Sequence, residues 1–312
     1  MTDTIESIFP TWRGKAALEP YLLRATDALH EKLNKSEQSI TYRNWHEEFE
    51  RLQSLQNPIL GYSYYSPDLF KHVNSISNKA LPYALLGLLI WHMNRFLINP
   101  ERYPAPNEFY IHVNDSMIRI CEAICNDEIL PDLKNDSFSK DLGIVRGALL
   151  PAMAQLIYPA SGIMRTVVMR NGLASAWYMY NNCGSLKPFM EIHTHDAMAK
   201  NYFNKSGWDE TYRLASYLLD YLPNSRGLFG SSWFYDPIVP KISPRLSYLQ
   251  DIPLSQGARL FRIGTSIADV NLATLTSDTR RNLYLSGQYL PTKYALVWPR
   301  KLLASYFQKD LI

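Results

Sequence analysis

Apolar residues return every three or four positions through the first half of the chain, which is the period of a helix. This spacing predicts a first helix over Ala16–Leu33, whose apolar side is formed by Leu18, Leu22, Ala25, Leu29 and Leu33. It predicts further helices over Thr41–Leu55, Pro67–Val73, Leu81–Leu97 and Glu108–Leu130. In the last of these, the buried side is predicted to carry Ile111, Ile118, Cys121 and Cys125.

The pattern changes near Pro159, after which short apolar runs alternate with turn residues. Gly162–Arg170 is rich in β-branched residues and is followed by Asn171-Gly172, a pair typical of tight hairpins with a positive φ at the glycine. We therefore predict a hairpin whose second strand is Leu173–Tyr180. Strands are expected only after about Pro159.

The rest of the chain alternates strands and helices. A third strand over Lys187–His195 is followed by an amphipathic helix over Trp208–Leu222 and a strand over Gly227–Tyr235. A strand–helix–strand step of this length predicts that the two strands are parallel. The smaller elements expected further on are helices over Ser243–Leu249 and from Ser277 to Leu285, and strands over Ala258–Ile263 and Tyr294–Trp298.

The predicted fold class is α+β. A helical domain is expected over residues 1–158, and a domain with a mixed sheet is expected over residues 159–312. The second domain is where we expect the functional site.

Composition narrows the possible partners. The formal net charge is +3 and the basic residues are spread along the chain, which argues against a nucleic-acid partner. The first residues lack the apolar run of a secretory signal, and three cysteines favour a reducing compartment, so we expect a cytoplasmic protein. The most apolar stretch, Ala80–Trp91, is shorter than the ~20 residues that span a bilayer, so it predicts a buried helix. The many tyrosines suit a pocket for a small molecule.

The order of elements over Gly162–Trp298 resembles the GNAT acyltransferase fold. In that family a meander leads to a central strand, a helix and then a parallel strand that splays away, and the pantetheine arm of the acyl donor lies in the splay. The resemblance implies that Pro188–His195 is the central strand and Gly227–Tyr235 the splaying one. It also implies an acyl transferase that acts on a small amine- or hydroxyl-bearing substrate, with acyl-CoA or an acyl-carrier-protein thioester as donor.

One segment departs from the family pattern. GNAT enzymes usually place a Gln/Arg-x-x-Gly-x-Gly/Ala loop between the central strand and the helix, and it binds the pyrophosphate of coenzyme A at a helix N-terminus. This chain has DAMAKNYFNKSGWDE there, in which Gly207 is the single glycine. Either the donor is held differently, for example as a carrier-protein thioester, or the chain lies outside this family.

The sharpest local feature is the run from Glu191 to Asp196. On a strand, Glu191, His193 and His195 would share one face, with Asp196 at the strand's end. One of these groups can serve as a general base, and we take His193, His195 and Asp196 as catalytic candidates and Glu191 as a substrate-binding one. We expect them to border the main cleft, opposite Tyr235. A hydrogen-bonded polar strand edge is the alternative.

A second feature surrounds Gly230. A glycine inside a strand marks a bulge or the close approach of a ligand. The candidates here are Ser231, Ser232 and Trp233 for substrate binding and Tyr235 as a general acid. A bulged core strand is an equally good interpretation.

A third feature is basic. Arg245 stands at a helix start, where it can bind a phosphate or carboxylate of the substrate, and Arg280 and Arg281 open a later helix. Surface ion pairs are the alternative for all three.

Two other functions remain open at this stage. His-x-His with a carboxylate is a familiar ligand spacing, so a metal-dependent enzyme is one alternative, although we assign no metal ligand. Asp68–His72 and Glu108–His112 also have the spacing that helical di-metal oxidases use. The other alternative is a non-enzymatic module that holds a small ligand in an aromatic pocket.

Overall fold

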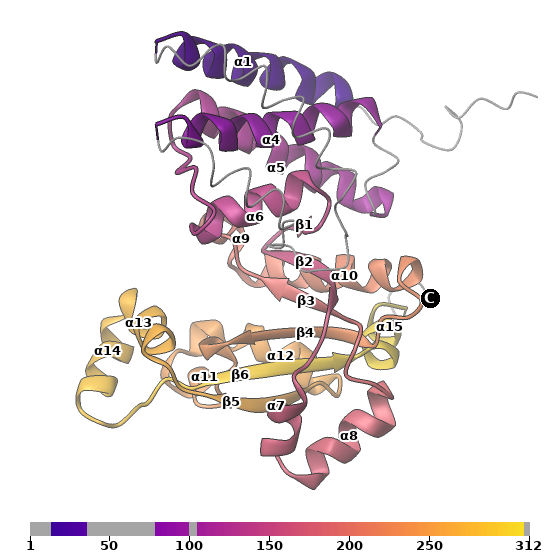
Figure 1. Ribbon diagram of the computed structural model, residues 1–312. Coiled ribbons are helices and arrows are strands. Elements are labelled where there is room, and N and C mark those ends of the chain that lie inside the picture. The colour runs from indigo at the N-terminus through magenta and orange to yellow at the C-terminus, as the bar shows by residue number, and fades with distance from the viewer. Residues whose placement is uncertain (1–13, 36–78, 100–104, 309–312) are drawn as a thin grey trace, which may run out of the picture. The chain divides into compact units, whose positions relative to one another are not determined.

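The chain divides into two compact units, Met1–Pro151 and Ala152–Ile312. The computed structural model describes residues 14–35, 79–99 and 105–308 (Figure 1). The helices predicted over Thr41–Leu55 and Pro67–Val73 lie outside the described residues. Within them, the fold is α+β, as predicted, because four helices precede a mixed sheet whose strands all lie at or after Leu150.

In the first unit, α1 (Gly14–Lys35) packs against α4 (Leu81–Ile98) and α5 (Asn107–Cys125). The five residues of the predicted apolar side of α1 are all buried, which confirms the helix and its face. Asn135 caps a further helix that the sequence did not predict, α6 (Asp136–Val145), by accepting a hydrogen bond from the Phe138 amide. α6 packs against α4 and α5.

Helix α4 is the apolar helix that the sequence predicts to be buried. In length and composition it is able to cross a membrane, yet 67% of its 18-residue window is buried inside the structure. Pro82 lies in its first turn, where a missing amide hydrogen costs nothing. Its place between α1 and α6 is that of a core helix within this unit.

The predicted buried side of α5 is wrong for Ile111, which is 63% exposed. Cys121 is buried as expected, but Ile118 and Cys125 are only partly so. The residues that form the buried side are Phe109, Val113, Met117, Ile120 and Ile124. The helix also ends at Cys125, before the predicted end at Leu130. The apolar positions support more than one helical face, and contacts with α1 decide between them.

The second unit contains a mixed six-stranded sheet with the order β1-β2-β3-β4-β6-β5. Its strands are β1 (Leu150–Ala152), β2 (Gln155–Ser161), β3 (Phe189–His193), β4 (Gly227–Ser232), β5 (Arg259–Gly264) and β6 (Lys293–Pro299). β3 and β4 are parallel, as predicted, whereas β2–β3, β4–β6 and β5–β6 are antiparallel. The sheet begins at Leu150 and not, as the sequence predicts, after Pro159. The chain turns at Met153, which has a positive φ, but the apolar run around it contains no glycine, asparagine or aspartate, the residues typical of such turns, so the sequence does not indicate this turn.

The predicted hairpin is wrong. Its two segments are helices, α7 (Arg165–Arg170) and α8 (Leu173–Cys183), and Gly172 joins them with a φ of 82°. The positive φ is therefore confirmed, but it serves a turn between helices. The side chain of Asn171 holds this turn against the sheet. Its Nδ2 donates to the Arg262 backbone carbonyl at 2.9 Å, and its Oδ1 accepts from the Arg262 backbone amide at 2.8 Å.

One end of one sheet face forms a core with α7 and α8. Its members include Phe189, Phe229, Phe261 and Val297 on the strands and Val167, Val168, Met179 and Cys183 on the helices. The opposite face packs against α10 (Lys205–Tyr221), which the sequence predicts, and α15 (Arg300–Gln308), which it does not. There the Trp298 ring lies 5.4 Å from Tyr212 and 5.9 Å from Tyr306. The sheet is thus a middle layer between helices (Figure 1).

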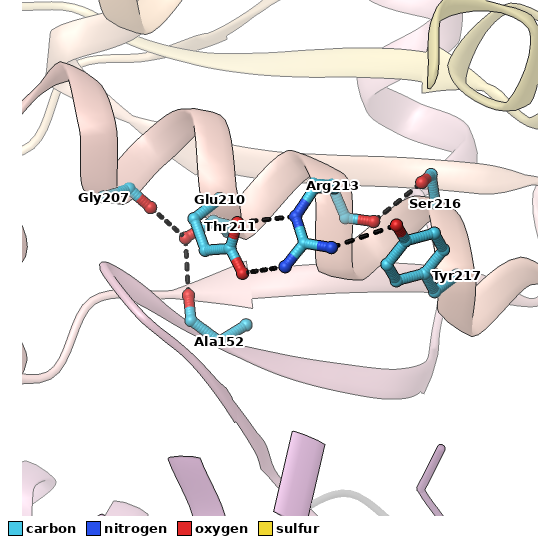
Figure 2. A network of polar contacts seen from close by, with 7 residues as sticks. All are labelled: Ala152, Gly207, Glu210, Thr211, Arg213, Ser216 and Tyr217. Carbon is cyan, nitrogen blue, oxygen red and sulfur yellow. Dashed lines mark hydrogen bonds and ion pairs between the residues drawn. The ribbon is translucent and has the colours of Figure 1, made fainter. Parts of the chain in front are cut away.

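Buried hydrogen bonds join α10 to the turn between β1 and β2. The Thr211 hydroxyl lies 2.5 Å from the Ala152 carbonyl oxygen and accepts a hydrogen bond of 3.2 Å from the Ala154 amide. On the neighbouring turns of α10, Arg213 pairs with Glu210 and donates to the Tyr217 hydroxyl at 3.0 Å (Figure 2). Thr211 is fully buried, so this joint holds the helix in register with the sheet.

The remaining elements follow the ends of strands. α9 (Asp196–Tyr202) follows β3, and η3 (Trp233–Tyr235) follows β4 and precedes α11 (Val239–Ile242), η4 (Pro244–Leu246) and α12 (Tyr248–Ser255). α13 (Ile267–Leu275) and α14 (Asp278–Leu285) connect β5 to β6. Ser277 caps α14 by accepting from the Arg280 amide, as its position in the sequence predicts. The sequence predicts neither α9 nor α13.

Candidate functional site

Five strands meet at one edge of the sheet, which we call the carboxyl edge because the parallel strands β3 and β4 end there. β2 begins opposite the end of β3, with Leu156 opposite His193. β6 begins opposite the end of β4, with Tyr294 opposite Ser232, and β5 ends beside it. The segments that leave β3, β4 and β5 therefore all start at this edge. Ligands commonly bind at such edges of α/β sheets.

At the carboxyl edge, β3 and β4 stop pairing with each other before either strand ends. Their last paired residues are Ile192 and Gly230. Beyond this point His193 still pairs with β2, and Ser232 still pairs with β6. The pairing of β3 and β4 therefore ends one residue before the end of β3 and two residues before the end of β4, and we call this point the parting. The resemblance to the GNAT fold implies that the two strands splay apart, and a splay would begin here.

A polar group lies beside the parting, and we call it the Glu191 cluster: Glu191, His193, Ser161 and Lys293. Glu191 and His193 share a face of β3, and Oε2 of Glu191 lies 3.6 Å from Nε2 of His193. The Ser161 hydroxyl donates to the same oxygen at 2.6 Å. The side chains of Glu191 and His193 are 21% and 19% exposed, although Nε2 of His193 is itself sealed from solvent.

The electrostatics of this cluster favour an ionised Glu191. Burial acts to raise the pKa of the carboxyl group. The nearby imidazole of His193, the hydrogen bond from Ser161 and the charge of Lys293 outweigh burial and lower the pKa of Glu191 below its usual range. The group therefore carries its negative charge at neutral pH beside the imidazole.

The two predicted serines face different ways. Glu191 pairs with Phe229 across β3 and β4, so Ser231, two residues further along β4, shares the face of the Glu191 cluster. Ser232 points to the opposite face. Both residues are partly exposed. The structure therefore places Ser231, but not Ser232, on the face of the sheet that carries His193.

His195 lies beyond the end of β3, so it is not part of the strand face on which the sequence places it with Glu191 and His193. β3 ends at His193, and His195 becomes the residue before α9. Its Nδ1 accepts a hydrogen bond of 3.1 Å from the Ala197 amide, and the side chain is 2% exposed. His195 caps the helix because the chain turns away from the sheet directly after β3. Asp196 is exposed in the first turn of α9, where a negative charge suits the helix dipole.

Tyr235 lies on the opposite face of the sheet from His193. A Cβ atom built at Gly230 would lie 3.2 Å from the Tyr235 hydroxyl oxygen and 2.5 Å from Cγ1 of Ile192. Glycine is therefore needed because two side chains crowd its Cα. The predicted bulge at Gly230 is wrong, since β4 pairs with β6 in regular register. Burial raises the pKa of Tyr235 well above its ordinary value, so the hydroxyl keeps its proton.

Two other predicted residues belong to a second polar group at the carboxyl edge. The Arg280 guanidinium lies 4.6 Å from the centre of the Trp233 ring. Burial lowers the pKa of Arg280, and the charge of the exposed Arg245 lowers it further. The sequence allows a surface role for Arg280, but the side chain is only 2% exposed. Trp233 and Arg245 are thus drawn together around a buried cation.

The described residues do not form the alternative metal sites. Across residues 14–35, 79–99 and 105–308, no three His, Cys, Asp or Glu side chains gather closely enough to hold a metal ion. Nδ1 of His195 accepts a hydrogen bond at the start of α9, and neither the Glu191–His193 pair nor Glu108–His112 has a third ligand within this part of the chain. The Asp68–His72 pair lies outside the described residues.

Sequence reasoning missed Ser161 and Lys293 in the Glu191 cluster. Ser161 closes β2 and Lys293 opens β6, so they are far from Glu191 in the chain. Neither has a local pattern that marks it as functional. The only sequence feature that marks Ser161 and Lys293 is that each is a polar residue at the boundary of an apolar strand. This feature identifies them as neighbours of Glu191 only when the order of the strands is known.

Comparisons with known proteins add little. No family model and no curated protein match the chain. Two solved structures resemble it weakly, each with a TM-score of 0.40. One is an acyltransferase in complex with decanoyl-CoA, which is 12% identical, and the match covers 88% of this chain and 98% of that one. The other is an acyltransferase in complex with CoA and 10C-teicoplanin, which is 11% identical, with 80% and 88% covered. At such TM-scores and identities, neither assigns a family, an activity or a ligand to this chain.

Proposed function

We propose that the protein is a group transferase that moves an acyl group from a thioester donor to an amine or hydroxyl of a small substrate. The observation that carries the proposal is the parting of β3 and β4 beside the Glu191 cluster. A parting between parallel strands opens backbone groups to an extended ligand, and the cluster supplies an ionised carboxylate and an imidazole next to it.

The donor would lie between the parted strands. The pantetheine arm of coenzyme A, or of an acyl carrier protein, contains two amides that can pair with strand backbone as an added strand does. Ile192 and Gly230 mark where such an arm would enter, because β3 and β4 no longer pair beyond them. This placement would bring the thioester carbon close to His193.

The chemistry would need one base and one acid. His193 would take the proton from the acceptor's amine or hydroxyl as that group attacks the thioester carbon. The ionised Glu191 would orient the imidazole and stabilise its protonated form. The C–S bond then breaks, and the leaving thiolate takes a proton. The protonated His193 can return this proton, whereas the buried hydroxyl of Tyr235, which stays protonated, lies on the opposite face of the sheet.

The test is turnover with a panel of acyl-CoA donors and small amines, followed by release of the free thiol. His193→Gln is expected to lower kcat by ~10²-fold or more, the usual scale for a lost acid–base group. Glu191→Gln should lower it less, because the imidazole remains. The matched control is His112→Gln in the other unit, which should keep the wild-type rate.

Circular dichroism and Tm would establish that each variant is folded. The base assignment would be abandoned if transfer occurs and His193→Gln leaves kcat unchanged. Failure of every donor in the panel, with folded wild-type protein, would count against the acyl-transfer reaction itself.

A further inference from the structure

Arg280 is a buried cation without an acidic partner. Its side chain is 2% exposed and stacks on Trp233. Nε donates to the Ala273 carbonyl at 2.5 Å, and Nη1 donates to the Ser243 hydroxyl at 3.1 Å. No carboxylate in the described part of the chain forms an ion pair with it. Burying a charge in this way is costly, and proteins normally compensate it with an opposite charge.

One nitrogen of the Arg280 guanidinium, Nη2, is still accessible to solvent. Its Nη2 donates to none of the described residues, yet it is not among the side-chain nitrogens that are sealed from solvent without a partner. Arg245 is exposed and near enough for its charge to act on Arg280. The two positively charged guanidinium groups repel each other, and an anion bound between them would offset this repulsion.

A buried hydroxyl lies close enough to Arg280 for the charge of the guanidinium to act on it. Tyr289 is 4% exposed, and its hydroxyl oxygen is sealed from solvent and has no hydrogen-bond partner among the described residues. Burial raises the pKa of Tyr289, and the charges of Asp236 and Arg280 also act on it. An unsatisfied buried hydroxyl costs about 1–3 kcal/mol. A ligand oxygen beside Arg280 would accept its proton.

The buried carboxylate of Asp236, whose charge also acts on Tyr289, does not fill this role. Asp236 is buried, but its two oxygens accept hydrogen bonds from the backbone amides of Ile238, at 3.1 Å, and Thr292, at 3.2 Å. These bonds hold η3 against the start of β6. Asp236 therefore neutralises neither Arg280 nor Arg245 by direct contact.

We propose that Arg280, Arg245 and Tyr289 form a binding site for a compact oxyanion, a phosphate or carboxylate group, at the carboxyl edge of the sheet. The two arginines supply the positive charge, and the Tyr289 hydroxyl donates to the anion. Trp233 holds the Arg280 guanidinium plane in place. Under the proposed function, on which this step alone rests, the anionic group belongs to the acceptor substrate, because Trp233 directly follows the parted strand β4.

The experiment measures binding without turnover. The full chain is titrated at neutral pH with sodium phosphate and, separately, with sodium acetate, at an ionic strength held constant with sodium chloride, and Tm is recorded. At least one anion should raise Tm in a saturable way, since a ligand that binds the folded state stabilises it. A rise in Tm with phosphate alone would identify the ligand group as a phosphate. An equal rise with acetate would identify it as a carboxylate.

Variants locate the anion. Arg245→Gln should weaken binding about tenfold, because it removes a charged hydrogen-bonding group. Tyr289→Phe should weaken it by a smaller factor, and Arg280→Lys should abolish it. The matched control is Arg281→Gln on the same helix, whose guanidinium is exposed and pairs with Asp278. If Arg280→Lys does not fold, Arg245→Gln and Tyr289→Phe still decide the question.

The site is rejected if neither anion gives a saturable shift above sodium chloride. It is also rejected if Arg245→Gln and Tyr289→Phe both bind as the Arg281→Gln control does. Binding in the His193→Gln variant should remain intact. The anion site and the proposed transfer reaction can therefore fail separately.

Discussion

The two ends of one sheet face differ in character although the same strands build both. Near the amino ends of β3 and β4, Phe189 and Phe229 pack with α7 and α8. Two residues further along β3, the same face carries Glu191, and then His193. The apolar end is closed by helices, while the polar end stays partly open at the carboxyl edge.

This difference shows how a short strand serves both stability and function. Side chains at every second position share a face, so a five-residue strand has room for one core residue and two site residues. The core end holds the strands in register. In this arrangement the Ser161 hydroxyl reaches Glu191, and Lys293 is close enough for its charge to act on that carboxylate. The predictions below separate the two ends by their effect on stability.

The largest effect is expected at the core end. Phe229→Ala should lower the free energy of unfolding by about 3–5 kcal/mol, because it leaves a cavity against Phe189, whose ring centre lies 6.1 Å away. The measurement is urea unfolding of the full chain. Leu285→Ala is the control, since Leu285 is 74% exposed and should change stability by no more than about 0.5 kcal/mol. Equal effects of the two changes would remove the distinction between core and surface.

A middle-sized effect is expected on the opposite face, where the strands begin to part. Gly230→Ala should destabilise by about 1–3 kcal/mol, because the new methyl group would overlap Ile192. Ile192→Ala removes the side-chain atoms that the new methyl group would overlap. It should therefore lower the free energy of unfolding less in the Gly230→Ala variant than in the wild-type protein. Simple additivity of the two changes would show that Ile192 and Gly230 do not meet.

The smallest effect is expected at the polar end, and it depends on pH. Because the folded state lowers the pKa of Glu191 from about 4.5, its stabilisation is present above that pH and is lost as pH falls through the lowered value. Ser161→Ala removes one of the hydrogen bonds responsible and should cost about 0.5–1.5 kcal/mol at pH 7. The loss should shrink in acid.

The comparison for this last variant is Ser255→Ala. Ser255 is exposed and donates to a nearby helix carbonyl, so any change in stability should not vary with pH. Urea midpoints at several pH values give both results. A Ser161→Ala loss that stays constant down to the acid limit would mean that Glu191 gains nothing from this hydroxyl.

Local patterns were sufficient where one periodicity dominated. The apolar side of α1, the amphipathic α10 and the Ser277 cap of α14 follow from spacings of a few residues. The step from β3 through α10 to β4 also follows, because a crossover of that length enforces parallel strands. These elements depend on interactions that a short window contains.

Tertiary contacts decided the rest. Valine-rich Arg165–Arg170 became a helix because one helical side packs on the sheet and Asn171 binds the backbone of β5. His195 became a helix cap because β3 ends two residues earlier. The sequence alone determined which segments are regular and that chemistry-bearing residues stand near strand ends. Only the folded sheet could bring Ser161, Lys293 and Arg280 to their partners, because strand order and burial arise from contacts between residues distant in the chain.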